Sequence, residues 1–505
     1  MTANNAALAS KAAAPAARHA AREWLRVLAL PLALHVALCL GLYQYGLNRA
    51  QLAQIHADGP ARLIDPYVRA LHAFGPLGPL RVYLHGEQDE RLYLEYSKLL
   101  LLGHADIHFI AERQNDPSLD VPLRARAWPY RDVRVEYPPL AFVATLPPAL
   151  LSTHYQAYRY AFAAYMLLLH LSNLWLAAKL LGVQTLGPTT QAHGQAKQVA
   201  GRVLYLSLAF FAGLGMVSVL RMDHLVVTCT LAILLAFERA QRSTAPSQRL
   251  RWALLCGVLT ALGVMTKLVP GLAGLAAVTL WLGSSAPDRL RSALACSVAC
   301  ALTLVATNVA MYALVGDRYL DTVRYHALRG VQLESLYAGA IMLLRPLGVA
   351  MHVADSFGST NLVSAATPWI KPLSLLLFAA CAGYLVCLRR FTADARGAVC
   401  LTCALLLAFV LTNRVFSPQY LIWIAAPWCV LAATETPLRK GWLWFLLAVC
   451  LSQLMYPRGY PLLKALHPVG MLVVNLRNLT LIVFGVWLVR ASSQARTLRR
   501  APQNL

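Results

Sequence analysis

The chain has 505 residues, of which 58% are hydrophobic and only 13% are charged. About a quarter of the residues in an average soluble domain are charged, so this composition excludes a soluble protein and indicates many membrane spans. The net charge of +23 does not indicate nucleic-acid binding, because the Lys and Arg residues lie between apolar segments instead of forming one basic face. We expect membrane lipids, and no nucleic acid, among the partners.

The hydrophobic segments predict an all-α polytopic membrane protein with about 12 transmembrane helices. We expect a cytoplasmic tail over 1–22, a transmembrane domain over 23–490 and a basic cytoplasmic tail over 491–505. Merging 252–283 into one span would move the later Arg and Lys clusters outside, against the positive-inside rule, so twelve spans and cytoplasmic termini are favoured. The expected spans are 27–46, 158–182, 199–219, 224–238, 252–266, 269–283, 292–315, 370–388, 398–412, 420–434, 441–455 and 467–489.

The eleven cysteines all fall in apolar stretches. Their spacing fits neither a metal site nor a disulfide framework, so they are interpreted as small core residues. The richness in Ala, Leu and Arg favours a bacterial source, and hence a multi-pass protein of the plasma (inner) membrane.

The longest polar stretch, 48–157, is expected to be a first extracytoplasmic loop that re-enters the membrane. Apolar residues at helical spacing, from Leu92 to Leu102, predict a helix lying on the membrane surface. Residues 104–127 are expected to form a surface excursion. Pro138-Pro139 suits the start of a helix, since proline is tolerated in the first turn.

Polar clusters recur where spans reach the presumed outer face, which predicts one-sided chemistry. The first is Glu87-x-Asp89. Two neighbouring carboxylates are typical of a general base, with a divalent cation (Mg or Mn) shared between them as a further option. The alternative interpretation is a solvated helix start, where acids offset the helix dipole.

Three further charged residues lie close to apolar spans. Arg221 and Asp223 fill a short outer turn. Either Arg221 binds an anionic lipid while Asp223 orients it or a sugar hydroxyl, or the two charges simply end the helices at the interface. Lys267 lies between apolar residues, and an ammonium at that depth is costly unless it is paired. Pro270-Gly271 is expected to break the helix there, leaving backbone groups that line a cavity or pack in protein.

Two later outer loops carry side chains suited to anions or saccharides. The first contains His326, Arg329 and Glu334, together with Gln332. The second contains Arg414, Gln419 and Tyr420, for which an interfacial aromatic belt is the alternative. Asn475, Arg477 and Asn478 lie inside the last span and are expected to face the bundle.

The ordered motifs resemble those of the GT-C glycosyltransferases that use polyprenyl-phosphate sugars, and among them the family 87 mannosyltransferases. The resemblance covers nearly the whole chain and is strongest in its order and sidedness. It implies a GT-C-like bundle whose long first extracytoplasmic loop carries interfacial helices. Its motifs are Glu87-x-Asp89, Tyr93, Gly103, Pro129-Tyr130, Tyr137-Pro138-Pro139, Arg221-x-Asp223, Thr266-Lys267, His326-x-x-Arg329-Gly330, Glu334-Ser335 and Ser417-x-Gln419-Tyr420.

The resemblance implies an inverting hexosyltransferase that moves a sugar, expected to be mannose, from a polyprenyl-phosphate donor to a hydroxyl of a lipid-linked or cell-envelope glycan acceptor. Asp89 would be the catalytic base. His326, Arg329, Lys267, Arg414 and Arg221 would bind the donor phosphate, and Glu87, Tyr93, Tyr137, Asp223, Glu334, Gln419 and Tyr420 the sugar or acceptor. The alternatives are a lipid-linked saccharide flippase or transporter, and an O-antigen ligase or polymerase-like enzyme.

Overall fold

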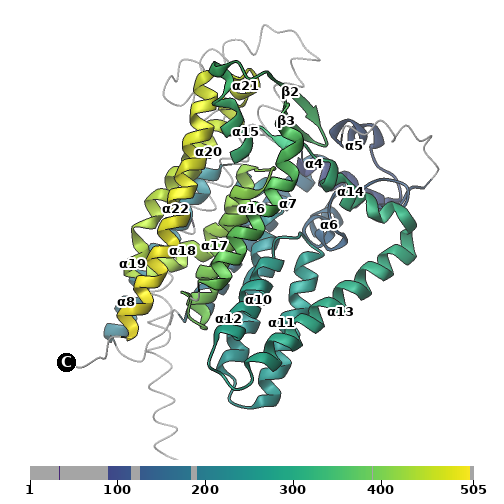
Figure 1. The fold of residues 1–505 in the computed structure, drawn as a ribbon. Helices are drawn as coiled ribbons and strands as arrows, with labels where there is room; N and C mark the ends of the chain where they lie inside the picture. Colours follow the sequence, from purple (N-terminus) through teal and green to yellow (C-terminus); the bar gives the residue numbers. More distant parts are fainter. Residues whose placement is uncertain are drawn as a thin grey trace, which may run out of the picture.

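The computed structural model describes residues 89–114, 126–182, 190–215, 217–388 and 390–500, together with Ala33. The predicted first span at 27–46 (apart from that one residue), the N-terminal tail and Glu87 therefore lie outside the described residues. Figure 1 shows a mostly helical protein in which long helices run side by side. Short elements gather toward the upper end of that view, where α4 (Asp89–Leu102), α14 (Asp321–Leu328), α15 (Leu336–Met342) and the strands are found.

Each span expected from residue 158 onward coincides with helical structure. Five of the described helices, α7, α13, α16, α17 and α22, are long and apolar enough to cross a membrane. A total of twelve spans stays a prediction. The helices are α7 (Tyr155–Leu180), α8 (Thr190–Leu214), α9 (Val217–Leu220), α10 (Asp223–Arg242), α11 (Pro246–Val264), α12 (Gly271–Gly283), α13 (Arg289–Val315), α16 (Thr367–Cys387), α17 (Ala395–Thr412), α18 (Ile422–Thr434), α20 (Gly441–Gln453) and α22 (Pro468–Arg500).

The core is centred on α17 and α18. Nearly every residue of α18 is buried, including Trp423 and Trp428. A helix that is apolar all round must be enclosed by other helices, and α18 packs against α7, α8, α10 and α17. The break predicted at Pro270-Gly271 is confirmed, because α11 ends at Val264 and α12 begins at Gly271.

Helix α13 is held to α11 through small residues. A Cβ built at Gly257 would lie 2.2 Å from the carbonyl oxygen of Cys296 and 2.9 Å from the Cβ of Ala299. Close backbone approach at glycine is typical of helix pairs in membranes, where burial of apolar area cannot drive association. The opposite side of α13 exposes a row of large apolar side chains, as a lipid-facing helix would.

Gly257→Ala is therefore expected to destabilise the protein by about 1–3 kcal/mol, because the added methyl group must push two helix backbones apart. Thermal unfolding of the purified protein in detergent would measure the effect. The matched control is Gly283→Ala, where an added Cβ meets nothing within 4 Å. Equal melting temperatures for the two variants would contradict the packing described for α11 and α13.

The fold is mostly helical, as predicted, but the outer region also contains a small antiparallel sheet that was not predicted. Its strands are β1 (Val331–Gln332), β2 (Met351–Ser356) and β3 (Ser359–Ser364), in the order β1-β3-β2. Phe357 and Gly358 both have positive φ, of 49° and 61°. Two such residues form the tight turn that matches the twist of a two-stranded hairpin.

The predicted surface helix exists, but it is enclosed by protein. Helix α4 (Asp89–Leu102) packs against α6 (Phe142–Leu151) and α7, and it buries residues on all sides. Glu90 is fully buried, 3.1 Å from Arg159 Nε, and it accepts a hydrogen bond of 2.8 Å from Tyr155. Since a carboxylate is costly to bury without partners, this ion pair ties α4 to α7 within the fold.

The residues that follow α4 hold the first loop against the rest of the protein. Within the expected surface excursion, α5 (Ile107–Gln114) is a short helix whose apolar side is buried. The helix start predicted at Pro138-Pro139 is confirmed by the 3-10 turn η3 (Pro139–Ala141), which leads directly into α6. Residues 133–137 therefore approach the bundle along a fixed path.

Candidate active site

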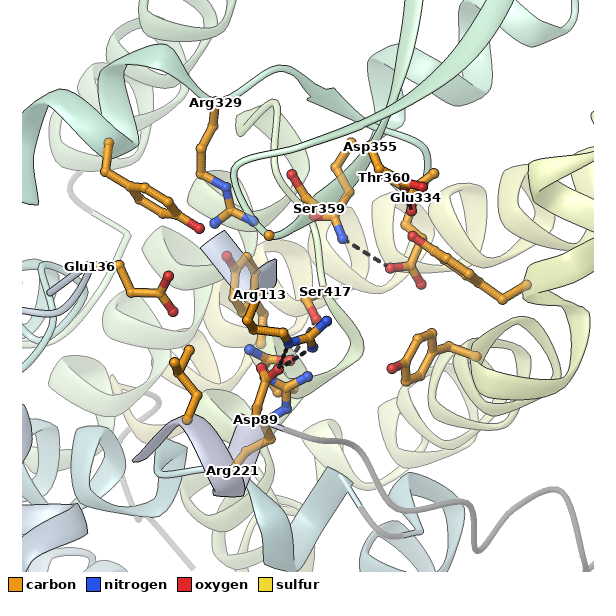
Figure 2. A pocket seen from close by; sticks show the side chains of 18 of the residues that line it. Asp89, Arg113, Glu136, Arg221, Arg329, Glu334, Asp355, Ser359, Thr360 and Ser417 are labelled. Atoms are coloured by element: carbon orange, nitrogen blue, oxygen red, sulfur yellow. Dashed lines mark hydrogen bonds and ion pairs between the residues drawn. The ribbon is translucent and has the colours of Figure 1, made fainter. Parts of the chain in front are cut away.

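A pocket of about 410 Å³ opens among the short elements that gather at one end of the bundle. Segments far apart in the sequence contribute to it, and Figure 2 shows charged side chains from several of them pointing toward one another. The walls come from the start of α4, from α5, from the residues before η3, from the turn before α10 and from the region around the sheet. The charged lining residues are Asp89, Glu112, Arg113, Glu136, Arg221, Arg329, Glu334, Asp355 and Lys464.

Asp89 lies at the first turn of α4, and both of its carboxylate oxygens are ion-paired. Oδ1 accepts hydrogen bonds from Nε and Nη2 of Arg113, the first at 3.2 Å, and Oδ2 is paired with Arg221. Arg221 itself is only 6% exposed. Two guanidinium groups favour the ionised carboxylate and oppose its protonation. In this arrangement Asp89 accepts a proton poorly, so the predicted base role requires the arginines to move first.

The cation predicted at Glu87 and Asp89 is not tested by the residues that the structure describes. Glu87 lies outside them, and the negative charge of Asp89 is already offset by Arg113 and Arg221. No group of three or more His, Cys, Asp or Glu residues in the described part of the chain is arranged to hold a metal ion. A divalent cation would need the carboxylate oxygens that the arginines occupy.

Arg329 is a pocket cation without an ion-pair partner among the described residues. Its guanidinium lies 5.8 Å from the centroid of the Tyr325 ring, and its buried Nε has no hydrogen-bond partner. A buried guanidinium nitrogen without a partner is costly, so its presence needs an explanation. An anionic ligand in the pocket would supply the missing acceptor, and a guanidinium matches a phosphate group through two hydrogen bonds.

Glu136 lies on a segment that α14 (Asp321–Leu328) holds in place. The Thr322 hydroxyl donates a 2.8 Å hydrogen bond to the carbonyl of Val135, and His326 Nε2 donates one of 2.8 Å to the carbonyl of Glu136. Figure 2 shows the Glu136 side chain projecting into the pocket. His326 therefore positions the segment through its ring nitrogen and does not itself line the pocket.

The ring of His326 is neutral at pH 7. Although part of the residue's surface is exposed, desolvation of the ring and the charges of Arg329, Lys267 and Arg414 lower its pKa to about 4. The resemblance implies that His326 binds the donor phosphate. The structure instead gives it the role of a hydrogen-bond donor to the backbone, so any phosphate contact of this residue stays a prediction.

The far wall of the pocket combines hydroxyl, amide and carboxylate groups around the β2–β3 hairpin. Asp355 accepts a hydrogen bond of 2.5 Å from Thr360 and lies 3.0 Å from Lys464 Nζ. Burial alone would raise the pKa of Asp355, but the bonds from Thr360 and Lys464 outweigh it and hold that pKa below its usual value. Burial and the charge of Glu334 raise the pKa of Tyr460, so its phenol stays a hydrogen-bond donor.

Lys267 does not line the pocket, because it is held behind the aromatic wall. Its ammonium donates a hydrogen bond of 2.7 Å to Asp223, which is fully buried and also accepts one of 2.6 Å from Trp423 Nε1. The same ammonium lies 5.6 Å from the ring centroid of Tyr420, which does line the pocket. Of the predicted base Asp89 and the predicted phosphate ligands Lys267 and His326, only Asp89 lines the pocket.

Two other predicted site residues, Arg414 and Tyr93, do not line the pocket and instead pack against neighbouring segments. The guanidinium of Arg414 donates hydrogen bonds of 2.7 and 3.0 Å to the carbonyls of His326 and Ala327, where it caps the end of α14. Tyr93 is 1% exposed and packs edge-on against the Tyr137 ring, with the centroids 5.8 Å apart. Arg477 faces the bundle as expected, and its Nη2 donates a hydrogen bond to the carbonyl of Glu334.

The predicted site residues therefore divide into two groups. Those that line the pocket are Asp89, Tyr137, Arg221, Arg329, Glu334, Gln419 and Tyr420, and those that lie behind it are Tyr93, Asp223, Lys267, His326 and Arg414. Among the lining residues that the prediction left out are Arg113, Glu136, Asp355, Tyr460 and Lys464. The sequence signal for Glu136 is its place in the first loop, directly before the membrane re-entry predicted at Pro138-Pro139.

No family model matches this chain, and no curated protein matches it. A solved structure does, that of ArnT from Cupriavidus metallidurans in the apo state. The match has 16% sequence identity and a TM-score of 0.37, and it covers 80% of this chain and 73% of the ArnT chain. At this level of similarity, roles of individual residues do not transfer between the two proteins.

Proposed function

We propose that this protein is a GT-C-type glycosyltransferase of the plasma membrane. It takes a sugar from a polyprenyl-phosphate donor and attaches it to a hydroxyl of a lipid-linked or cell-envelope acceptor on the extracytoplasmic side, and mannose is the sugar we propose. The observation that carries the proposal is a polar pocket at one end of an apolar helical bundle, which several carboxylates line and in which Arg329 has no ion-pair partner among the described residues.

The leaving phosphate gains negative charge in this reaction, which gives the pocket arginines a role. A sugar joined to polyprenyl phosphate is a phosphodiester with one negative charge, and its departure leaves a phosphomonoester that gains a second. Guanidinium groups fixed where that charge develops stabilise the transition state more than the ground state. Arg329 is available for this contact. Arg221 and Arg113 are the next candidates, and they would exchange Asp89 for the phosphate.

The proposed sugar contacts line the same pocket. Saccharide hydroxyl groups bind to carboxylates, amides and tyrosine hydroxyls, and Glu334, Gln419 and Tyr137 provide one of each around the pocket. The Ser417 hydroxyl donates a 2.6 Å hydrogen bond to the side chain of Gln419, which fixes the amide orientation. Tyr420 stacks on Trp423 with the ring centroids 4.3 Å apart, which gives the pocket a rigid aromatic floor.

A transfer assay with the full chain in proteoliposomes tests the proposal. The donor would be mannosyl phosphate on a C55 polyprenol, and the acceptors short alkyl mannosides. Mass spectrometry is expected to find a new glycosidic product and free polyprenyl phosphate in equal amounts. Transfer from a polyprenyl diphosphate oligosaccharide alone would identify a ligase-like enzyme. Movement of labelled lipid across the bilayer without a new glycosidic bond would identify a transporter. Either result would overturn the proposal.

A further inference from the structure

We propose that Glu136 is the group that takes the proton from the acceptor hydroxyl, in place of Asp89. The inference rests on the proposed function, because it assigns a role in that reaction. Asp89, Glu334 and Asp355 are held by cations or by hydrogen bonds. Glu136 forms no ion pair with a described residue, and the remaining pocket carboxylate, Glu112, is exposed on α5. The sequence alone does not show that Glu136 lies in the same pocket as these carboxylates.

The partners of the pocket carboxylates distinguish them. Asp89 is paired with two arginines, and Asp355 with Lys464 and Thr360. Glu334 is 1% exposed and accepts a 3.3 Å hydrogen bond from Gln332. The carboxylate of Glu136 forms no ion pair with any residue in the described part of the chain. A carboxylate without a bound cation is the better proton acceptor, because ion pairing favours its deprotonated form and lowers its basicity.

The position of Glu136 is fixed before any substrate arrives. His326 and Thr322 hold the backbone of the segment through its carbonyls, and the rigid Pro138-Pro139 pair follows immediately. A catalytic group gains most when its geometry is set by neighbours that do not take part in the reaction. The hydrogen bond from His326 to the carbonyl of Glu136 therefore positions the proposed base.

Arg329 lines the same pocket as Glu136 and is the cation we assign to the leaving polyprenyl phosphate. Tyr325 lies beside both groups, as a hydrogen-bond neighbour of the Glu136 carboxylate and with its ring centroid 5.8 Å from the Arg329 guanidinium. Glu136 and Arg329 attract each other through their charges but form no ion pair. Figure 2 shows the Glu136 carboxylate and the Arg329 guanidinium on the same side of the pocket. The acceptor hydroxyl would meet the first group and the donor phosphate the second.

The step balances without any further reagent. The acceptor oxygen forms a bond to the anomeric carbon as the bond between that carbon and the phosphate oxygen breaks. The acceptor proton passes to Glu136, and the electron pair of the broken bond leaves with the polyprenyl phosphate. The proton then moves to water when the products depart. Neither an oxidant nor a reductant takes part.

The test compares Glu136→Gln with Asp321→Asn, a change of a partly exposed carboxylate on the neighbouring helix, in the same proteoliposome assay. Glu136→Gln is expected to lower kcat by about 10²- to 10⁴-fold with little change in the KM for the donor. Asp321→Asn is expected to keep the wild-type rate. A wild-type rate for Glu136→Gln would overturn the assignment.

Azide distinguishes a base from a residue that only maintains the structure. It attacks the anomeric carbon without losing a proton, so it is expected to restore turnover of Glu136→Ala and to yield a glycosyl azide. The inference is wrong if azide rescues Asp89→Ala and leaves Glu136→Ala inactive, since Asp89 would then be the base. If the wild-type protein transfers no sugar from any donor tested, the proposed function itself fails, and the two failures are thereby separated.

Discussion

Arg329→Met is expected to lower the rate of sugar transfer by about 10²- to 10³-fold, the loss typical of removing one preorganised charge contact from a transition state. The reason is local. Arg329 lines the pocket, its guanidinium has no ion-pair partner in the part of the chain that the structure describes, and its Nε is buried without a hydrogen bond. The loss should appear in kcat more than in KM, because the leaving phosphate carries more charge than the donor.

The control for this change is Arg324→Met. Arg324 is on the preceding helix and forms an exposed ion pair with Asp321, at 2.9 Å. This control removes the same charge a short distance along the chain and is expected to keep the wild-type kcat. Arg329→Lys is expected to be faster than Arg329→Met, since lysine keeps the positive charge but cannot form the bidentate hydrogen bonds of a guanidinium with a phosphate. Equal rates for Arg329→Met and the wild type would exclude Arg329 from the phosphate site.

The buried pair of Lys267 and Asp223 is expected to show the largest effect on stability. Either single change, Lys267→Met or Asp223→Leu, leaves an uncompensated charge among apolar helices, and each is expected to cost about 3–5 kcal/mol. The side chains are only 17% and 1% exposed. The double change removes both charges together and is expected to regain most of that loss, because a well-packed apolar pair replaces the ion pair.

Unfolding in detergent, followed for all three variants, measures this coupling. The comparison pair is Lys464 and Asp355, whose ion pair is similarly short but whose side chains are 42% and 55% exposed. Exposed pairs contribute less than about 1 kcal/mol, so changes there should alter the melting temperature little. Additive losses in the Lys267 and Asp223 double variant would show that the two charges do not stabilise each other.

The helical part of the fold was predictable because burial in lipid imposes a simple rule. Apolar stretches must form helices, and the expected spans from residue 158 onward coincide with them. The break at Pro270-Gly271 followed from backbone chemistry alone. The β2–β3 hairpin was missed because its short strands lie in a polar loop, where the Phe357-Gly358 turn is a weak signal beside the strong hydrophobic periodicity.

The sequence predicted several of the charged residues that line the pocket, but it did not predict which of them form ion pairs. Sequence patterns identified Asp89, Arg221 and Arg329 as charged residues near span ends, and all three line one pocket. They did not show that Arg113 would pair with Asp89, since that contact depends on where α5 packs. Lys267 was singled out for its burial cost, and the cost is met by Asp223 and not by a ligand. Which charged side chains pair depends on how the helices pack, and the sequence pattern does not show that packing.

A cryo-electron microscopy structure of the full chain with polyprenyl monophosphate bound tests the central claim most directly. We expect the phosphate inside the pocket, in direct contact with the guanidinium of Arg329, with the prenyl chain leaving the pocket between helices toward the lipid-facing surface. A phosphate bound at the opposite end of the bundle, with Arg329 still lacking an anionic partner, would contradict the proposed sugar transfer.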